Sequence, residues 1–488
     1  MDRSIYKFGL IAFALALSAC KQTTNGTVVD ENGNPINGVT VFMANTFGET
    51  FSTLTNNNGE FDFPNFEGQL SHVSTQTVDF IDRAYTRNSF NAQKHMLTLE
   101  PDLNNIDSDG DGLTDGEEYL LGTSRFSVDT DGDSLSDKVE SLLVDSFSPL
   151  ALGVTPRYKD ILLEIDWSQE DPHSRITPLA ILIMQSNFKR APIENPNGET
   201  GIRLIVDDGR FGGGSAIDIP AQWYRTGENE AFFDTQIASE RVPYFYHTAA
   251  VGSIRSGSRS LFGYAYFYSR ENYVTGSFSG LGPIESLAEA LLLQHELGHN
   301  LFLFHGGDDH IRCKPNYPSV MNYNPYLTLS TTYSQGKMPT LDESNLDETI
   351  GVGLGPVDWD MDFLIEDTPV QASVNAMVPV NIIQHIAELL NLEELPVIGG
   401  LFADGRCGDP SHYEVLRDHN DWERIEENLG RYISESMGEI NPASSVSRMS
   451  ISGELNHVED DYFPIEILKL LNEAGVTEED LLNSIDEP

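Results

Sequence analysis

The spacing of apolar and polar residues divides the chain into segments of different kinds. Residues 25–100 alternate Val, Thr and Phe with polar residues, and turn signals such as NG and GNP separate the runs, as in NGTVVDENGNPINGVTVFMA. A period of two between turn residues predicts β-strands joined as hairpins. Beyond residue 156 the apolar runs are continuous, so YKDILLEIDW, GIRLIVDDG and LFGYAYFYS predict buried strands, whereas LAILIMQSNF and RDHNDWERIEENLG predict helices.

A further helix is predicted over residues 285–301, where IESLAEALLLQHELGHNLFL carries Leu and Ala at helical spacing. His295 and His299 are one turn apart on this helix and therefore point to the same side. Two imidazoles on one face can bind Zn²⁺ through nitrogen, and Glu296 lies beside them, where a carboxylate can take a proton from a bound water.

A catalytic zinc ion needs a third protein ligand, and His305 is the nearest candidate. On a continuing helix, six residues would rotate His305 by about 600° and carry it about 9 Å along the axis, away from His299. His305 can therefore join the other two histidines only if the helix ends after Leu301 and the chain turns back.

These residues resemble the signature of the metzincin metalloproteases, HExxHxxGxxH, which is followed downstream by a tight turn around a methionine. The resemblance implies that one zinc ion is held by His295, His299 and His305. It also implies that Glu296 is the general base. The glycine of the signature is Phe302 here. A bulky residue with positive φ costs about 1–2 kcal/mol, so this turn is either strained or built differently.

The Met-turn of the same family has a counterpart in CKPNYPSVMNY, residues 313–323, with Ser319, Met321 and Tyr323 at the matching positions. By this resemblance Met321 forms an apolar floor beneath the zinc site, and Tyr323 ligates zinc or stabilises the oxyanion. The family fold is an α+β domain with the active-site helix beneath a twisted mixed sheet, and we expect it over residues 156–430.

The activity implied by the resemblance is that of a zinc-dependent endopeptidase, which hydrolyses protein or peptide substrates with a zinc-bound water and Glu296 as base. Asp308 and Asp309 either orient the ligand imidazoles or are exposed carboxylates. The alternative function is a calcium-stabilised surface adhesion or scaffold lipoprotein whose metzincin-like domain is catalytically silent. The intact Glu296 argues against it, because a silent scaffold has no physical need for a carboxylate there.

Residues 101–145 contain an acidic loop in two copies, DSDGDGLTDGEE at 107–118 and DTDGDSLSDKVE at 129–140. The spacing matches an EF-hand calcium loop, with Gly112 at the sixth position of the first copy and Ser134 in the second. The copies resemble thrombospondin type-3 and dockerin repeats; otherwise they form a solvated acidic linker. The resemblance implies about two structural Ca²⁺ ions. The expected ligands are Asp107, Asp109, Asp111, Leu113, Asp115 and Glu118, and Asp129, Asp131, Asp133, Leu135, Asp137 and Glu140.

Residues 20–100 resemble the carboxypeptidase-regulatory-like β-sandwich modules, which act as spacers or adhesion modules. For the function of this segment, a generic all-β sandwich without a binding role is the favoured interpretation. The expected fold is therefore multidomain: an N-terminal β-sandwich, a calcium-loop linker and an α+β catalytic domain. Residues 431–488 form an acidic C-terminal tail to which the sequence assigns no role.

The chain of 488 residues has 29 basic and 76 acidic residues and a net charge of −47. This charge argues against nucleic acid as a partner and against electrostatic docking to anionic lipid. It suits a solvated protein that binds cations. The sequence does not indicate an oligomeric state.

The N-terminus, MDRSIYKFGLIAFALALSAC, has an apolar run that is too short to span a bilayer and predicts an export signal. LSAC resembles a bacterial lipobox, which implies a lipoprotein signal peptide at 1–19 and a lipid anchor on Cys20; otherwise the signal is a conventional one and the cysteine is incidental. By this resemblance the protein lies on the outer membrane or cell surface, or is released. An exported chain meets oxidising conditions, so Cys313 and Cys407 either form a disulfide or remain thiols.

Overall fold

The computed structural model describes residues 24–430, with gaps at 104, 226–237, 266–268, 277, 279–284, 324–331, 354, 361, 363 and 375–411. It is a mixed α/β structure of several sheets with few helices, which is compatible with a multidomain α+β fold. The predicted signal peptide 1–19, Cys20, Cys407 and the acidic tail 431–488 lie outside the described residues. Within the described part, no helix combines the length and apolar character needed to cross a membrane.

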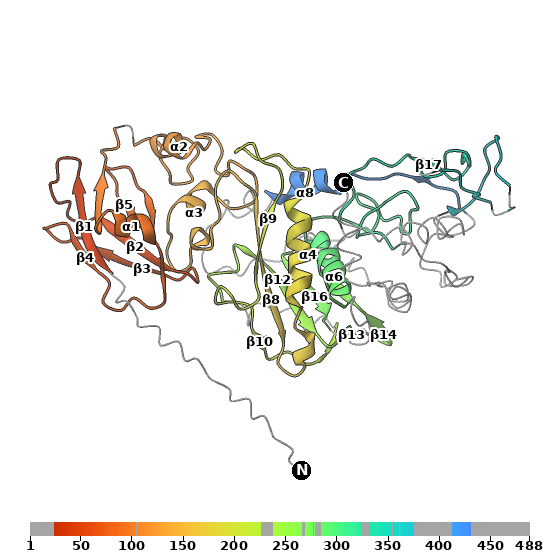
Figure 1. Ribbon diagram of the computed structural model, residues 1–488, viewed down its shortest axis with the longest axis horizontal. Coiled ribbons are helices and arrows are strands. Elements are labelled where there is room, and N and C mark those ends of the chain that lie inside the picture. Colours follow the sequence, from red (N-terminus) through yellow and green to blue (C-terminus); the bar gives the residue numbers. More distant parts are fainter. Residues whose placement is uncertain are drawn as a thin grey trace, which may run out of the picture.

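Residues 25–99 form two β-sheets that share one hydrophobic core (Figure 1). One sheet contains β4 (Glu60–Asp62), β1 (Asn25–Asp30) and β7 (Met96–Leu99), in that order. The other contains β3 (Thr50–Leu54), β2 (Thr40–Asn45), β5 (Leu70–Gln76) and β6 (Ala84–Thr86). The strands expected from the alternating pattern are present. A short helix, α1 (Arg87–Ala92), was not expected and buries Phe90 in the shared core.

The two acidic loops each lead into a short helix, α2 (Asp115–Leu121) and α3 (Asp137–Ser141). Thr114 caps α2 and forms a capping box with Glu117, which satisfies two of the backbone N–H groups left free at a helix start. A 3₁₀ turn, η1 (Pro149–Leu152), follows before the central sheet begins.

The central sheet holds six strands, and all neighbours are parallel except at one edge. Both β9 (Arg203–Asp207) and β10 (Ala216–Ile217) pair with β8 (Asp160–Ser168). The order then continues through β12 (Phe245–Val251), β16 (Glu271–Thr275) and β15 (Gly263–Ala265). Edge strand β15 runs antiparallel to β16.

Two helices, α4 (Pro178–Lys189) and α6 (Glu285–Asn300), lie side by side against one face of the central sheet (Figure 1). Alternate residues of β8 separate the two faces, as the strand period of two requires: Ile161 and Leu163 pack with the helices, whereas Leu162 packs on the opposite face. Helix α6 is buried on nearly all sides, and the predicted helix over 285–301 is therefore present.

Polar contacts fix α6 against α4 within this apolar core. The Thr177 hydroxyl caps α4 through Ala180 N–H and also contacts the Ser286 hydroxyl at 2.9 Å, and Glu289 accepts Thr177 N–H at 2.9 Å. Further along, the Asn187 amide donates to the Gln294 side chain at 3.0 Å. Burying a polar group without a partner costs free energy. These contacts therefore fix the position of α6 relative to α4 along the helix axis.

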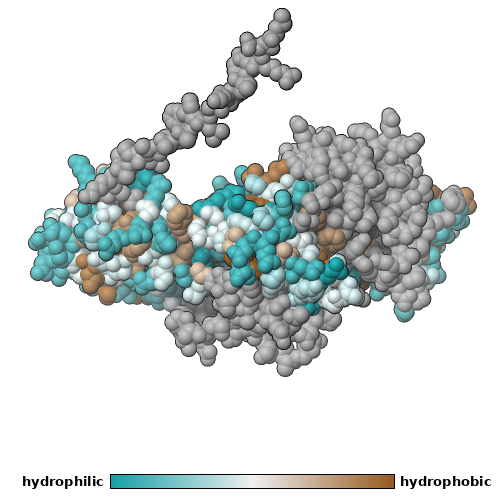
Figure 2. Space-filling view, turned by 90° about the horizontal axis from the view of Figure 1, so that it is seen from below, coloured by the Kyte–Doolittle hydropathy of each residue, from teal (hydrophilic) through white to brown (hydrophobic). Residues whose placement is uncertain are grey.

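Smaller elements complete the described chain. They are the 3₁₀ turn η2 (Pro172–Ser174), the sheet of β11 (Gln222–Tyr224), β13 (Ser253–Ser256) and β14 (Arg259–Leu261), the pair β17 (Leu341–Asp342) and β18 (Val415–Leu416), and helix α8 (Asp421–Leu429). On the face shown in Figure 2 the described surface is mainly hydrophilic, with small hydrophobic areas, as the acidic composition leads one to expect.

Candidate metal centre

Three histidines converge at the C-terminal end of α6. One ligand nitrogen each from His295, His299 and His305 can be chosen such that all lie within 4.8 Å of one another. Their exposed fractions are only 5%, 1% and 0%. The sequence placed the first two on one helix face, and the structure brings the third to them, so this cluster could hold a metal ion.

The chain reverses at Phe302, which has a φ of 71°. Phe302 N–H donates to His299 O at 3.1 Å, and Leu303 N–H donates to Gly298 O at 2.9 Å. This is the Schellman arrangement that closes a helix with a left-handed residue, a position usually held by glycine. Of the two alternatives for this turn, the structure has the strained one: the left-handed conformation is kept although the residue is a phenylalanine.

A second tight turn presents His305. Gly307 N–H donates to Phe304 O at 2.9 Å, and Phe304 N–H donates to Gly307 O at 2.8 Å, so His305 and Gly306 form the tip between them. Gly307 has a φ of 88°, which glycine adopts without the steric cost of a side chain. The His305 ring centroid then lies 4.8 Å from that of His299 and 5.2 Å from that of His295.

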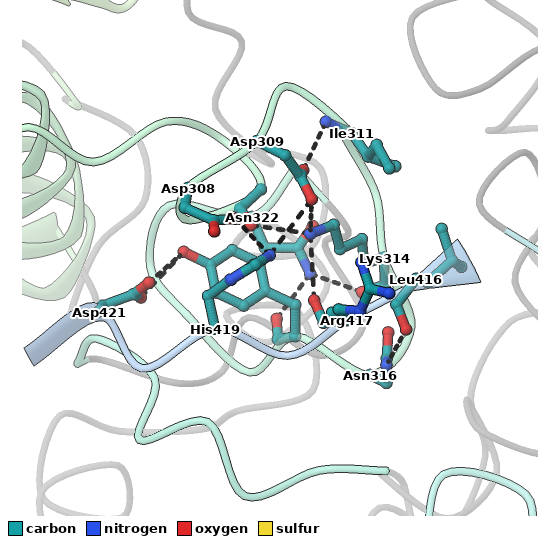
Figure 3. A network of polar contacts seen from close by, with 12 residues as sticks. Asp308, Asp309, Ile311, Lys314, Asn316, Asn322, Leu416, Arg417, His419 and Asp421 are labelled. Atoms are coloured by element: carbon teal, nitrogen blue, oxygen red, sulfur yellow. Dashed lines mark hydrogen bonds and ion pairs between the residues drawn. The ribbon is translucent and has the colours of Figure 1, made fainter. Parts of the chain in front are cut away.

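The buried side chain of Lys314 supports this turn through hydrogen bonds (Figure 3). Lys314 is fully buried, and its Nζ donates to Gly306 O at 2.8 Å and to Arg417 O at 3.1 Å, and pairs with Asp309 at 2.8 Å. Burial lowers the pKa of Lys314.

His419 Nε2 lies 2.6 Å from an Asp308 oxygen and 3.2 Å from an Asp309 oxygen. Both carboxylates thus brace the loop after His305.

Backbone carbonyls orient two of the three imidazoles. His295 Nδ1 lies 2.8 Å from Val320 O, and His299 Nδ1 lies 2.8 Å from Leu303 O. A carbonyl oxygen only accepts, so Nδ1 carries the proton and Nε2 presents its lone pair. For these two rings the Nδ1 contacts are therefore made by the main chain and not by Asp308 or Asp309. Orientation of His305 by either carboxylate stays a prediction.

Met321, which was predicted to form an apolar floor, packs against the helix that carries His295 and His299. Met321 is fully buried, and a Cβ on Gly298 would overlap its sulfur, so glycine in HELGH lets the methionine approach the helix. Ser319 Oγ accepts Met321 N–H at 3.2 Å and donates to Asp421 at 2.6 Å. Asp421, at the start of α8, also accepts from the Tyr317 hydroxyl at 2.8 Å.

Asp421 was not predicted from the sequence to belong to the site. Its carboxylate is buried and also accepts Ser334 N–H at 2.9 Å, and burial raises its pKa to about 7. The only local signal was its place at the predicted start of the helix in RDHNDWERIEENLG, where an acidic residue is favoured by the helix dipole. That signal does not reveal a contact with residues about one hundred positions earlier.

Of two further predicted residues, Tyr323 lies at the cluster and Glu296 lies against the edge strand of the central sheet. The Tyr323 ring centroid is 4.0 Å from that of His305 and 6.0 Å from that of His295. Glu296 is fully buried, and a Cβ on Gly263 of β15 would overlap its carboxylate. Glycine at this point of the edge strand therefore makes room for the carboxylate between α6 and the sheet.

Cys313, the first residue of the segment 313–323, is disulfide-bonded. Cys407 and Cys20 lie outside the described residues. The pairing of Cys313 with Cys407 therefore stays a prediction.

The two acidic loops lie away from the histidine cluster, and each gathers carboxylates of its own: Asp107, Asp109 and Asp111 in one, and Asp129, Asp131 and Asp133 in the other. The sixth position is left-handed in both, with φ of 93° at Gly112 and 78° at Ser134. Leu113, Leu135, Glu118 and Glu140 are buried.

Asp115 and Asp137, both predicted as ligands, brace their loops. Asp115 accepts from Ser108 N–H at 3.1 Å and from the Ser108 hydroxyl at 3.0 Å. Asp137 accepts from Thr130 N–H at 2.8 Å and from the Thr130 hydroxyl at 2.6 Å. In both copies the ninth residue is thus tied to the second. Burial raises the pKa of Glu118 to about 7 and that of Asp131 to about 8.

The conformation of Phe302 gives a stability prediction. Phe302→Gly and Phe302→Ala both remove a buried ring, a loss of about 3–5 kcal/mol for the alanine variant. Only glycine relieves the positive φ, so Phe302→Gly should be more stable than Phe302→Ala by about 1 kcal/mol. Urea unfolding followed by tryptophan fluorescence measures the difference. At an ordinary helix position alanine would be the more stable variant, and that order would show that the turn is not left-handed.

Comparison with known proteins adds no further identification. No protein-family model matches the chain, and no curated protein matches it.

Proposed function

We propose that this protein is a zinc-dependent endopeptidase of the metzincin type. The observation that carries the proposal is the convergence of His295, His299 and His305 in a buried cluster, with the Glu296 carboxylate next to the first of them in the chain. Strands, an active-site helix and a methionine turn, in this chain order, also support it.

The donor set fits zinc. Three imidazole nitrogens without a thiolate are the protein ligands of many catalytic zinc sites, which keep a fourth position open. The Nδ1 contacts of His295 and His299 with main-chain carbonyls fix the rings with Nε2 available. Zinc bound there would polarise the scissile carbonyl and acidify a water molecule.

Glu296 is assigned the proton transfers. It takes the proton from the attacking water and delivers it to the leaving amine. Its burial supports this role, because a carboxylate screened from bulk solvent keeps a transferred proton within the site. Tyr323 is assigned to the oxyanion, to which its hydroxyl would donate.

The edge strand β15 encloses the proposed base. It pairs with β16, and Gly263 of this strand lies against the Glu296 carboxylate. All three residues of β15 are buried, so the carboxylate lies between α6 and a buried strand of the central sheet.

The remaining domains are assigned on resemblance alone. We propose that residues 20–100 are a carboxypeptidase-regulatory-like spacer and that Cys20 carries a lipid anchor at the outer membrane or cell surface. The sheets of residues 25–99 are compatible with the first assignment.

The role of Glu296 is tested by Glu296→Gln. The variant should keep stoichiometric zinc, because Glu296 is not a ligand, and should lose about 10²–10⁴-fold of its rate of protein hydrolysis. Zinc is measured by plasma mass spectrometry and hydrolysis with an unstructured protein substrate. Glu285→Gln, in the first turn of the same helix, is the matched control and should keep full activity. Loss of zinc from Glu296→Gln, or retained hydrolysis, would contradict the assignment, and an inactive wild type would favour the scaffold alternative.

Tyr323→Phe removes a single hydroxyl from the cluster. If that hydroxyl stabilises the oxyanion, kcat should fall by about 10²-fold or more while zinc content and KM change little. Steady-state kinetics with a fluorogenic peptide gives both constants. An unchanged kcat would assign Tyr323 to packing against His305 instead.

A further inference from the structure

The second acidic loop, residues 129–140, is built into the central sheet. Leu135 packs in a core with Leu162 of β8, Ile205 of β9 and Phe245 of β12. The Ser134 hydroxyl also donates to Leu429 O at the end of α8. This loop therefore belongs physically to the unit that carries the histidine cluster.

A carboxylate from the central sheet joins the loop. Oxygens of Asp133, Glu140 and Asp160 lie within 4.8 Å of one another, and all three side chains are buried. Asp160 is the first residue of β8, and its N–H donates to Asp133 at 2.6 Å. The calcium-loop pattern ends at Glu140 and did not include Asp160.

Two carboxylates of the second acidic loop have no hydrogen-bond partner among the described residues. Among the described residues, neither oxygen of Glu140 and neither oxygen of Asp131 is bonded, although these side chains are only 1% and 4% exposed. A buried carboxylate without a partner is costly. A cation bound between Glu140, Asp131 and the neighbouring carboxylates would coordinate these oxygens and offset that cost.

The cationic side chains nearby do not balance the charge. Arg203 pairs with Asp160, and Lys159 pairs with Glu426 at 3.7 Å while its charge also acts on Asp131. These two cations face five carboxylates, those of Asp160 and of the loop residues Asp129, Asp131, Asp133 and Glu140. A divalent cation would bring the cluster close to neutrality.

We propose that residues 129–140 and Asp160 together form a divalent-cation site, with calcium as the ion, and that this ion fastens the loop to the first residue of β8. Oxygen-only ligands with several carboxylates suit Ca²⁺, whereas soft metals prefer nitrogen or sulfur. The ion is thus a structural part of the proposed peptidase unit and not only a stiffener of a linker. The proposal does not depend on the zinc chemistry.

The first loop provides a matched comparison, because its neighbours differ. Glu118 is buried with neither oxygen hydrogen-bonded among the described residues, as Glu140 is. However, the Asp82 N–H donates to Glu117 at 2.6 Å, which connects the first loop to the N-terminal sheets. An ion there would act on residues 25–99.

Calcium titration of Glu140→Gln and Glu118→Gln separates the two sites. In full-length protein freed of calcium on a chelating resin, isothermal titration should show two ions in the wild type and one strong site in each variant, with the altered site weakened about tenfold or more through lost ligand charge. Hydrogen exchange read by mass spectrometry should show that calcium protects β8 in the wild type and in Glu118→Gln but not in Glu140→Gln. Equal protection of β8 in both variants would overturn the proposal.

The role of Asp160 is tested by two substitutions that should change calcium affinity in opposite directions, each measured in the Glu118→Gln background. Asp160→Asn should weaken calcium binding about tenfold, because it removes a carboxylate from the site. Arg203→Met should strengthen it, because it removes a competing positive charge. If Asp160 acted only as the ion-pair partner of Arg203, both substitutions would weaken calcium binding alike. Calcium binding by Arg203→Met that is weaker than, or equal to, that of the parent protein would also overturn the assignment. Zinc content, measured in parallel, reports on the proposed function separately.

Discussion

The chain reversal at Phe302 is the constraint on which the rest of the site depends. Without it, the helix would carry His305 away from His295 and His299. The reversal is held from two directions: Schellman bonds close α6 itself, and Arg424 of α8 donates to Phe302 O at 2.6 Å. The cost of a left-handed phenylalanine is offset by these contacts and by burial of its ring.

Helix α8 therefore secures the site at two points. Arg424 holds the reversal, while Asp421 at its N-terminal end binds the hydroxyls of Tyr317 and Ser319 and so fixes the turn that carries Met321. The same helix ends at Leu429, whose carbonyl accepts the Ser134 hydroxyl of the second acidic loop. One short helix thus connects the histidine cluster, the methionine beneath it and the proposed calcium site.

The local sequence pattern was sufficient to predict features that are confined to one helix, strand or loop. The spacing of His295 and His299, the strands of the N-terminal sheets and the sixth position of each acidic loop are set by neighbours in the chain. Asp421, Lys314 and Asp160 were not predicted, because each acts on a segment that only the folded chain brings near. At Phe302 the pattern identified where the chain must turn, but it could not decide between a strained turn and a different one, since that choice depends on Arg424 and on packing.

Zinc K-edge X-ray absorption on the purified protein tests the central claim most directly, because it reports the ligand atoms of the metal without any assumption about activity. We expect stoichiometric zinc with three imidazole nitrogens at about 2.0–2.1 Å and one or two oxygens in the first shell. Sulfur scattering at about 2.3 Å, fewer than three imidazoles, or protein that binds no zinc would contradict the account.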